Sequence, residues 1–263
     1  MTRGVDLALH LVTDDRLAFE VLPSIVSAAI AGGATVVQLR DKRVDAAELI
    51  RRTCVLSEVI AGRVPLLVDD RVDVALAARD AGARVDGVHL GQSDIPPVTA
   101  RRLLGARAVI GWTANTPAHL CAAAALPAGT LDYLGVGVIR PTATKADHPP
   151  ALGIAGFGAL AASTALACVA IGGVEPGDVT PLRRAGAAGV AVVSAICGAD
   201  DPEAAARAFA QAAARPRAAA PATQAAARPR AAARTRAAAP ATRAAAPATP
   251  APPPVDAVSG ARR

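Results

Sequence analysis

Two lysines stand out, because the other 26 of the 28 basic residues are arginines. Lysine supplies a compact, movable ammonium that suits a phosphate whose charge changes during a reaction. Lys42 lies beside Arg40, and Lys145 follows the two hydroxyls of Thr142 and Thr144. We therefore expect two places on this chain that bind anionic groups.

Two acidic residues have the chemistry of a metal site. Asp70 and Asp94 each follow a short apolar run, and consecutive parallel strands lie about 5 Å apart, so their carboxylates can converge on one hard cation. Taken singly, either could be a helix N-cap or an ordinary loop acid. Mg²⁺ takes oxygen ligands and is held by one or two carboxylates with substrate phosphates. The pair predicts a Mg²⁺ site.

Glycines and a serine follow two later apolar runs. Gly172 and Gly173 come after one, and Val193 and Ser194 end the next. Glycine lets a backbone N–H approach an anion closely. These residues predict a second anion subsite built mainly from backbone and hydroxyl groups.

A regular alternation of strand-like and helix-like segments must position these residues. Several of the runs are apolar at consecutive positions, as in parallel strands covered on both faces. Amphipathic stretches such as 45–61 lie between them, and Ala-Gly motifs at 31–34, 81–83 and 185–187 mark helix ends. The eight predicted strands are 7–13, 34–39, 65–68, 86–90, 108–112, 132–137, 168–171 and 189–193.

Eight such units in about 210 residues favour an α/β fold of the (β/α)8 TIM-barrel class, in which chemistry lies at the carboxyl ends of the strands. A doubly wound open sheet is the alternative. It would normally carry a glycine-rich nucleotide-binding turn after an early strand, and the sequence has none. The barrel is predicted for residues 1–214.

Residues 215–263 have a different composition. They repeat Ala, Pro and Arg, and they carry nine arginines against the single acid Asp256. Such a segment predicts a disordered, low-complexity cationic tail. Because 19 basic and 21 acidic residues remain in 1–214, nucleic-acid binding is not expected, except weakly through the tail.

Other classes of protein are disfavoured. The start has no continuous apolar region typical of a secretory signal, and the four cysteines are too dispersed for a disulfide framework or a zinc site. The uncharged stretch 154–174 is long enough to span a bilayer, but its glycines and mixed pattern argue against membrane insertion. We expect a cytoplasmic protein in which none of the four histidines is catalytic. The oligomeric state stays open.

Seven segments, in order, resemble the thiamine-phosphate synthase family, also called thiamine-phosphate pyrophosphorylase. The resemblance covers residues 6–210 and excludes the tail. The segments are VQLRDK at 37–42, DDR at 69–71, GVHLGQSD at 87–94, DYLGVG at 132–137, PTATK at 141–145, AIGGV at 170–174 and VVSAI at 192–196.

The resemblance implies a Mg²⁺-dependent barrel transferase with two phosphorylated substrates. It would join 4-amino-2-methyl-5-hydroxymethylpyrimidine diphosphate to 4-methyl-5-(2-phosphoethyl)thiazole, releasing diphosphate and forming thiamine phosphate. Arg40, Lys42 and Lys145 would be catalytic and hold the diphosphate, and Asp70 and Asp94 would hold the metal. The implied substrate-binding residues are Gln38, Leu39, Arg40, Asp41, Lys42, Asp69, Thr113, Thr142, Ala143, Thr144, Lys145, Gly173, Val193 and Ser194.

Three residues depart from the family pattern. Asp69 replaces the usual Asn, Val138 the usual Pro and Arg140 the usual aromatic residue. Asp69 places an anion where diphosphate is expected, which puts full activity in question. Two alternative functions stay open: a thiazole tautomerase-like isomerase, and a non-catalytic protein that binds thiazole or thiamine phosphates.

Overall fold

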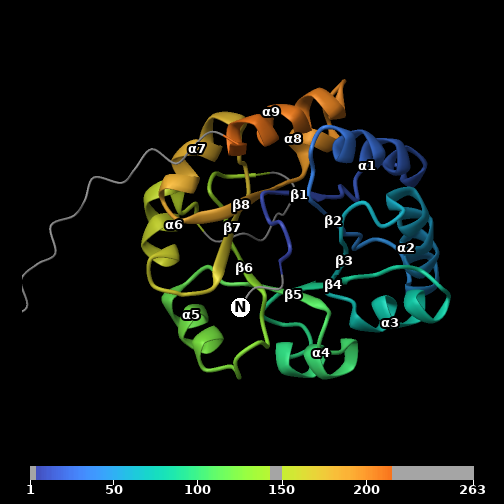
Figure 1. The fold of residues 1–263 in the computed structure, drawn as a ribbon, viewed down its shortest axis with the longest axis horizontal. Helices are drawn as coiled ribbons and strands as arrows, with labels where there is room; N and C mark the ends of the chain where they lie inside the picture. The colour runs from blue at the N-terminus through green and yellow to red at the C-terminus, as the bar shows by residue number, and fades with distance from the viewer. Residues whose placement is uncertain (1–3, 143–149, 215–263) are drawn as a thin grey trace, which may run out of the picture. The chain divides into compact units, whose positions relative to one another are not determined.

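The computed structural model describes residues 4–142 and 150–214. Its centre is a closed barrel of eight parallel strands in the order β1 to β8, with helices around it (Figure 1). The predicted (β/α)8 fold is confirmed, and each of the eight expected strands is present. They are β1 Leu9–Val12, β2 Val36–Leu39, β3 Leu66–Asp69, β4 Gly87–Leu90, β5 Val109–Thr113, β6 Tyr133–Gly137, β7 Ala167–Ile171 and β8 Ala187–Val192.

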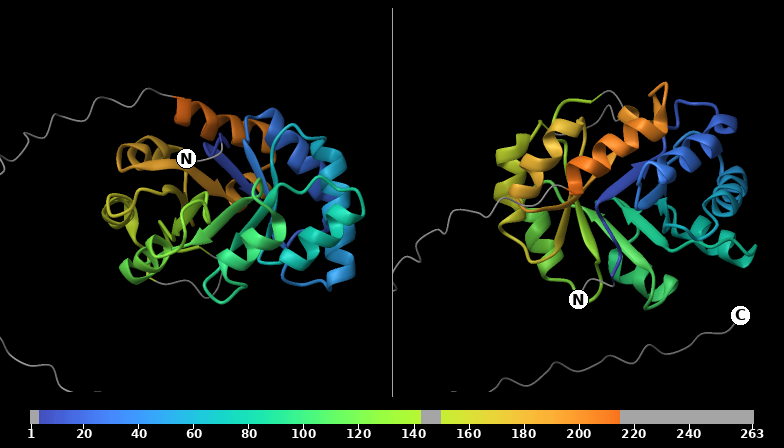
Figure 2. Two further views of the ribbon diagram at one scale, coloured as in Figure 1. Left: turned by 60° about the horizontal axis from the view of Figure 1, so that its bottom comes forward. Right: turned by 45° about the horizontal axis from the view of Figure 1, so that its top comes forward.

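Helices connect successive strands and cover the outside of the barrel, as the two views of Figure 2 show. Their bounds are η1 Phe19–Val21, α1 Leu22–Ala31, α2 Ala46–Ile60, α3 Val72–Asp80, α4 Pro97–Leu104, α5 Pro117–Ala124, α6 Gly153–Ala161, α7 Pro176–Arg184, α8 Ser194–Cys197 and α9 Pro202–Ala214. The predicted tail, 215–263, lies outside the described residues.

Helix α2 shows how local sequence sets these elements. Asp45 caps its first turn by accepting a hydrogen bond from the Glu48 backbone N–H (2.9 Å), which satisfies one of the donors that a helix start leaves open. Leu49 and Leu56 are buried on one face. The helix stops where Ala61 adopts a left-handed conformation, with φ 49°. The Ala-Gly motifs likewise coincide with the ends of α1, α3 and α7, as predicted.

The barrel has two packed layers of apolar side chains. Side chains that point outward from the strands, such as Leu9, Val37 and Val88, pack under the helices in one large core. A smaller cluster that includes Leu67, Val109 and Tyr133 fills the barrel interior. The interior is therefore a solid base, and the carboxyl end above it is the place for a site.

Glycines make two close approaches possible. A methyl group at Gly111 would collide with the rings of Tyr133 and His89, so this position leaves room for both rings inside the barrel. At Gly32 a methyl group would strike the backbone of α9, which packs against α1. The first approach makes room for two rings inside the barrel, and the second allows α9 to pack closely against α1.

The uncharged stretch 154–174 falls on α6 and β7, two separate elements of the barrel. Within the described ranges, no helix is both long and apolar enough to cross a bilayer. All four cysteines are free thiols. Burial raises the pKa of Cys168 to about 11 and that of Cys197 to about 12, so these two thiols behave as small core side chains.

Candidate active site

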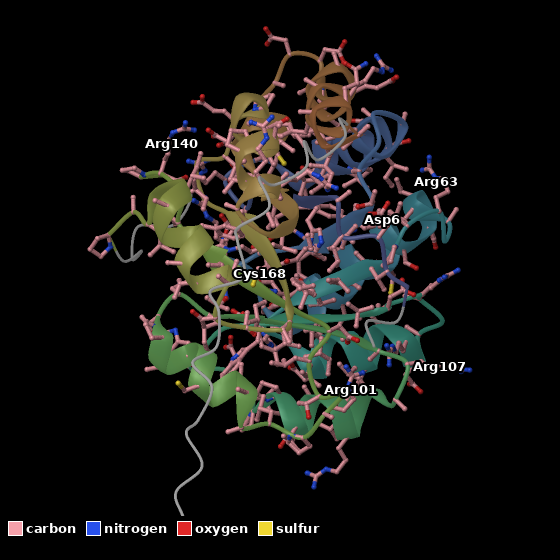
Figure 3. All side chains as sticks on the ribbon, turned by 60° about the vertical axis from the view of Figure 1, so that its left-hand side comes forward. Asp6, Arg63, Arg101, Arg107, Arg140 and Cys168 are labelled. Carbon is pink, nitrogen blue, oxygen red and sulfur yellow. The ribbon has the colours of Figure 1, made fainter. Side chains whose placement is uncertain are left out.

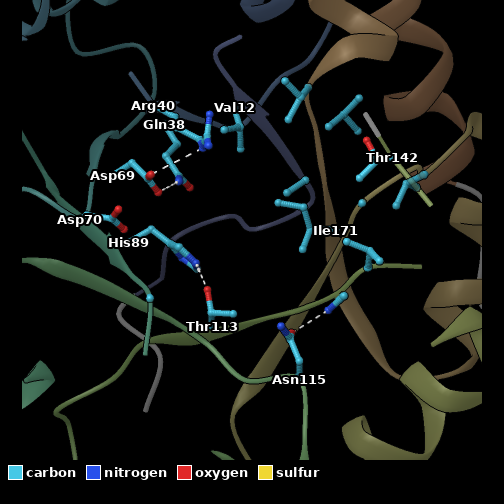
Figure 4. Close-up of a pocket in the computed structure, with 18 of the residues that line it drawn as sticks. Val12, Gln38, Arg40, Asp69, Asp70, His89, Thr113, Asn115, Thr142 and Ile171 are labelled. Atoms are coloured by element: carbon cyan, nitrogen blue, oxygen red, sulfur yellow. Dashed lines mark hydrogen bonds and ion pairs between the residues drawn. The ribbon is translucent and has the colours of Figure 1, made fainter. Parts of the chain in front are cut away.

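A cavity of about 680 Å³ lies at the carboxyl end of the barrel (Figure 4). All eight strands or the loops that follow them supply its lining. The predicted site residues that line it are Gln38, Arg40, Lys42, Asp69, Asp70, Asp94, Thr113, Thr142, Gly173, Val193 and Ser194. The barrel thus brings together residues that are up to 156 positions apart in the chain.

Charged residues after β2 and β3 form one side of the cavity. The Lys42 ammonium pairs with the Asp70 carboxylate and lies 3.3 Å from Asp69 Oδ2. Arg40 Nε lies 3.8 Å from the same Asp69 oxygen. Two cations and two carboxylates therefore share this side, and an anionic ligand that entered here would compete with the carboxylates for the cations.

Asp69 is held by an amide as well as by cations. Its Oδ1 accepts a hydrogen bond from Gln38 Nε2 (2.6 Å). A carboxylate can only accept, so this bond fixes which end of the Gln38 amide faces Asp69. The side-chain carbonyl oxygen of Gln38 and the second N–H of its amide group can then contact the polar edge of a ligand. Asp69, which stands where the family usually has Asn, thus has defined side-chain partners in the fold.

Asp70 and Asp94 reach the cavity from different loops. Asp70 has φ 59°, a left-handed conformation, and its N–H donates to the His89 carbonyl (2.7 Å). Such backbone is rare outside glycine, Asn and Asp and is common at functional sites. Asp94 Oδ2 accepts from the Gly91 N–H (2.6 Å). The backbone of Asp70 is therefore anchored to β4, and the Asp94 carboxylate is oriented by its own loop.

The oxygen chemistry of these two acids fits Mg²⁺. Across the described parts of the chain, no group of three or more His, Cys, Asp and Glu is placed to hold a metal alone. Mg²⁺ commonly takes one or two carboxylates and completes its shell with water and phosphate oxygens. Asp70 and Asp94 would hold it, and Mg²⁺ would take the place of the Lys42 ammonium at the Asp70 carboxylate.

His89 is a cavity residue that the sequence reasoning missed. Its ring shares hydrogen bonds with Thr113 Oγ1 (3.1 Å) and the Tyr133 hydroxyl (2.9 Å), as Figure 4 shows for Thr113. Burial raises the pKa of Tyr133, so its hydroxyl stays neutral. His89 points inward from β4 and orients the Thr113 hydroxyl. The run GVHL gives one indication of this inward position in the sequence, because strand alternation places the side chain of His89 on the same face of β4 as Gly87.

Asn115 and Gln92 also line the cavity. Asn115 Oδ1 accepts from the Gly137 N–H (3.1 Å), which ties the end of β5 to the end of β6. Gln92 Nε2 donates to the Thr113 carbonyl (2.5 Å). Both residues stand in the strand-end segments, so their position was visible in the sequence, but their contacts depend on neighbouring strands.

The opposite side of the cavity carries glycines and hydroxyls. Gly172 and Gly173 have φ 93° and 65°, and methyl groups there would strike Val138 and Arg140. Ser194 begins α8, where first-turn N–H groups lack acceptors within the helix. Thr142 lies on the same side in Figure 4. This side can bind an anion through backbone N–H groups and hydroxyls.

Arg140 has a structural partner. Its guanidinium pairs with Asp178 near the start of α7, with Nη2 2.7 Å from Oδ1. The same aspartate accepts from the Glu175 N–H (2.9 Å) as part of a capping box. The residue that replaces the family's usual aromatic therefore joins the loop after β6 to α7.

Two predicted binding residues do not line the cavity. Leu39 points outward into the core and is 1% exposed, because strand alternation puts it opposite Gln38. Asp41 pairs with Arg52 of α2 at 2.6 Å. The predictions for Ala143, Thr144 and Lys145 lie outside the described residues.

The fold and this cavity define a (β/α)8 barrel with a charged, phosphate-compatible site at its carboxyl end. The family model for thiamine monophosphate synthase matches residues 9–196. The chain is 48% identical over 211 residues to a thiamine-phosphate synthase of Xanthobacter autotrophicus, covering 80% of this chain and 96% of that one. It is 44% identical over 201 residues to one of Psychrobacter sp., covering 76% and 92%.

A solved structure agrees. Thiamine phosphate pyrophosphorylase from Pyrococcus furiosus superposes with a TM-score of 0.68 at 30% identity, covering 80% of this chain and 96% of that chain. This chain belongs to the thiamine monophosphate synthase family.

Proposed function

We propose that this chain is a transferase of thiamine biosynthesis that uses Mg²⁺. It condenses 4-amino-2-methyl-5-hydroxymethylpyrimidine diphosphate with 4-methyl-5-(2-phosphoethyl)thiazole, giving thiamine phosphate and diphosphate. The observation that carries this proposal is one cavity with two chemically different anion-binding sides. One side has Arg40 and Lys42, and the other has Gly173 and Ser194.

The cationic side would bind the diphosphate. Arg40 and Lys42 stabilise the negative charge that grows on this group as the carbon–oxygen bond breaks and the electron pair leaves with it. When bound at Asp70 and Asp94, Mg²⁺ supplies further charge neutralisation to the phosphate oxygens. Gln38 would contact the pyrimidine ring through its carbonyl oxygen and remaining N–H.

The glycine and hydroxyl side would hold the thiazole phosphate. Backbone N–H groups of Gly173 and Ser194 suit a phosphate monoester, and the apolar side chains of Val12 and Ile171 line the space between the two sides. Binding there would place the thiazole nitrogen to donate its lone pair to the pyrimidine methylene carbon. Positioning and electrostatics carry this reaction, with no nucleophilic side chain required.

Diphosphate release tests the proposal. The purified chain with both heterocycles and Mg²⁺ should release one diphosphate for each thiamine phosphate formed. Asp70→Ala should lower the rate by about 10²-fold or more, because it removes a ligand of the Mg²⁺ that would neutralise charge on the leaving group, and it should leave the fold intact by circular dichroism.

Each alternative has its own outcome. A tautomerase would isomerise a thiazole substrate without releasing diphosphate. A binding protein would take up ligand in calorimetry without turnover. Absence of both products from folded wild-type chain would contradict the transferase.

A further inference from the structure

Asp15 contacts both cationic residues of the site from outside the cavity. Its Oδ2 accepts a hydrogen bond from Arg40 Nη1 (3.1 Å) and another from the Lys42 backbone N–H (3.1 Å). The side chain is 9% exposed, and Asp15 is absent from the residues that line the cavity. It follows β1, a strand that supplies none of the predicted site residues.

The neighbouring Thr13 strengthens the same connection. Its hydroxyl donates to the Arg40 carbonyl (3.0 Å) and accepts from the Arg40 N–H (2.9 Å). Both backbone groups of Arg40 are thus fixed to the segment after β1, and Asp15 fixes the guanidinium and the start of the Lys42 residue. Two residues of the segment after β1, Thr13 and Asp15, therefore fix the backbone of Arg40, its guanidinium and the backbone N–H of Lys42.

Asp15 balances a second carboxylate on Arg40. Nε of the guanidinium lies 3.8 Å from Asp69 Oδ2, so Asp15 and Asp69 attract different parts of one planar group. Without the Asp15 charge, Asp69 would be the closest remaining partner, and the guanidinium would shift toward it. A diphosphate would then have to displace Asp69 from a closer ion pair with Arg40.

We propose that Asp15 is a positioning residue that holds the Arg40 guanidinium and the backbone of Lys42 in the arrangement that receives the diphosphate. This inference rests on the proposed function. It assigns a polar role to the segment after β1, a strand that otherwise lines the cavity through the apolar Val12.

Two effects of removing the charge oppose each other. Loss of one negative charge draws an anion in, but in a cavity open to solvent this attraction is screened and amounts to a factor of a few. Misplacement of a positioning group can cost about 10²-fold in rate. We therefore expect a net loss when Asp15 becomes neutral.

Asp132 offers a closely matched control at the other end of the barrel. Its Oδ2 accepts from Arg101 Nη2 (2.6 Å) and from the Ile110 backbone N–H (2.8 Å), and its side chain is also 9% exposed. It has the same set of partners as Asp15, one guanidinium and one backbone N–H, but it lies before β6 and away from the cavity.

The experiment compares Asp15→Asn with Asp132→Asn. Measurements are thermal unfolding, steady-state kinetics for each substrate, and calorimetric binding of inorganic diphosphate. Asp15→Asn should lower kcat/KM for the pyrimidine diphosphate and weaken diphosphate binding by about tenfold or more, with KM for the thiazole phosphate changed by less than about twofold. Asp132→Asn should lower thermal stability and leave all the kinetic values near those of the wild type.

Three results would overturn the inference: Asp15→Asn with diphosphate affinity and kcat/KM near wild type, tighter diphosphate binding, or the same selective loss in Asp132→Asn. If Asp15→Asn does not fold, Asp15→Glu takes its place, since it moves the carboxylate by one methylene, and the same selective loss is expected. A wild-type chain that binds diphosphate without turnover, with binding weakened by Asp15→Asn, would contradict the proposed function but not this inference.

Discussion

Two arginines at opposite ends of the barrel differ in how their donors are used. Before β6, Arg101 donates to the carbonyls of Thr130 and Ala108 and to Asp132, so each of its three nitrogens has an acceptor. After β2, Arg40 pairs with Asp15 through Nη1 and approaches Asp69 through Nε. No acceptor for its Nη2 is found in the described ranges.

The ends themselves are distinct in the molecule. Figure 3 shows Asp6, Arg63 and Arg107, which precede β1, β3 and β5, on one side of the view and Arg140, which follows β6, on the other. At the amino end, Arg101 and Arg63 donate to loop and helix carbonyls. At the carboxyl end, Arg140 is held by Asp178, whereas Arg40 lines the cavity, which distinguishes a structural cation from one available to a ligand.

Replacing Arg101 or Arg40 with methionine should give the largest effects and should distinguish the structural role from the ligand-binding role. Arg101→Met leaves the buried Asp132 without its cation, so we expect the free energy of unfolding to fall by about 3 kcal/mol or more. Arg40→Met also leaves Asp15 without its cation, but Arg40 donates fewer side-chain hydrogen bonds than Arg101 among the described residues, so the free energy of unfolding should fall by less, about 1–2 kcal/mol. The rate of diphosphate release should fall by about 10²-fold. Urea unfolding and a diphosphate assay on the same preparations check both.

Loss of activity in folded Arg101→Met, or full activity in Arg40→Met, would contradict the roles assigned to these two arginines. Because the two substitutions are chemically identical, a general effect of losing an arginine cannot produce opposite outcomes.

His10 lies in the barrel interior between the two ends and should make stability depend on pH. Burial, with a smaller contribution from the charge of His89, lowers its pKa from 6.5 to about 3. From pH 6.5 down to about 3 the unfolded chain binds a proton that the native state does not, so stability is complete above this window and is lost as pH falls, by up to about 1.4 kcal/mol per pH unit.

His10→Gln should remove this dependence. Between pH 7 and pH 5 the free energy of unfolding of the wild type should fall by about 2 kcal/mol more than that of the variant. His119→Gln, a change in α5 on the barrel exterior, is the control. Parallel pH curves for wild type and His10→Gln would contradict the assignment.

Among these substitutions, Asp69→Asn should have the smallest effect. Asn keeps an acceptor for Gln38 but releases Lys42 and Arg40 from a carboxylate, so kcat/KM for the pyrimidine diphosphate should stay equal or rise by up to about fivefold. Steady-state kinetics at fixed ionic strength measure the change. A loss of about tenfold or more would show that this chain needs the Asp69 charge.

Much of the fold could be predicted from local patterns. The apolar runs identified all eight strands, and Ala-Gly motifs identified helix ends, because burial and backbone conformation leave local traces in the sequence. Strand ends also located most cavity residues. Leu39 does not line the cavity, because alternation along β2 turns its side chain away from that of Gln38 and into the core.

Other parts of the site carried weaker signals in the sequence. A lone histidine or asparagine has many ordinary roles, so the contacts that make His89 and Asn115 part of the cavity were defined only once β4, β5 and β6 were neighbours. Asp15 gave no signal in the sequence either, since its contact with Arg40 forms only when β1 and β2 lie side by side.

Hydrophobic periodicity and turn chemistry are local properties, so the succession of strands and helices and the polar residues that end each strand can be read from the chain without its fold. The folded barrel is needed to know which of those residues share a cavity, which arginines keep free donors and which carboxylates hold them. Those properties depend on closure of the barrel, which sets the direction of each side chain through hydrogen bonds between segments far apart in the chain.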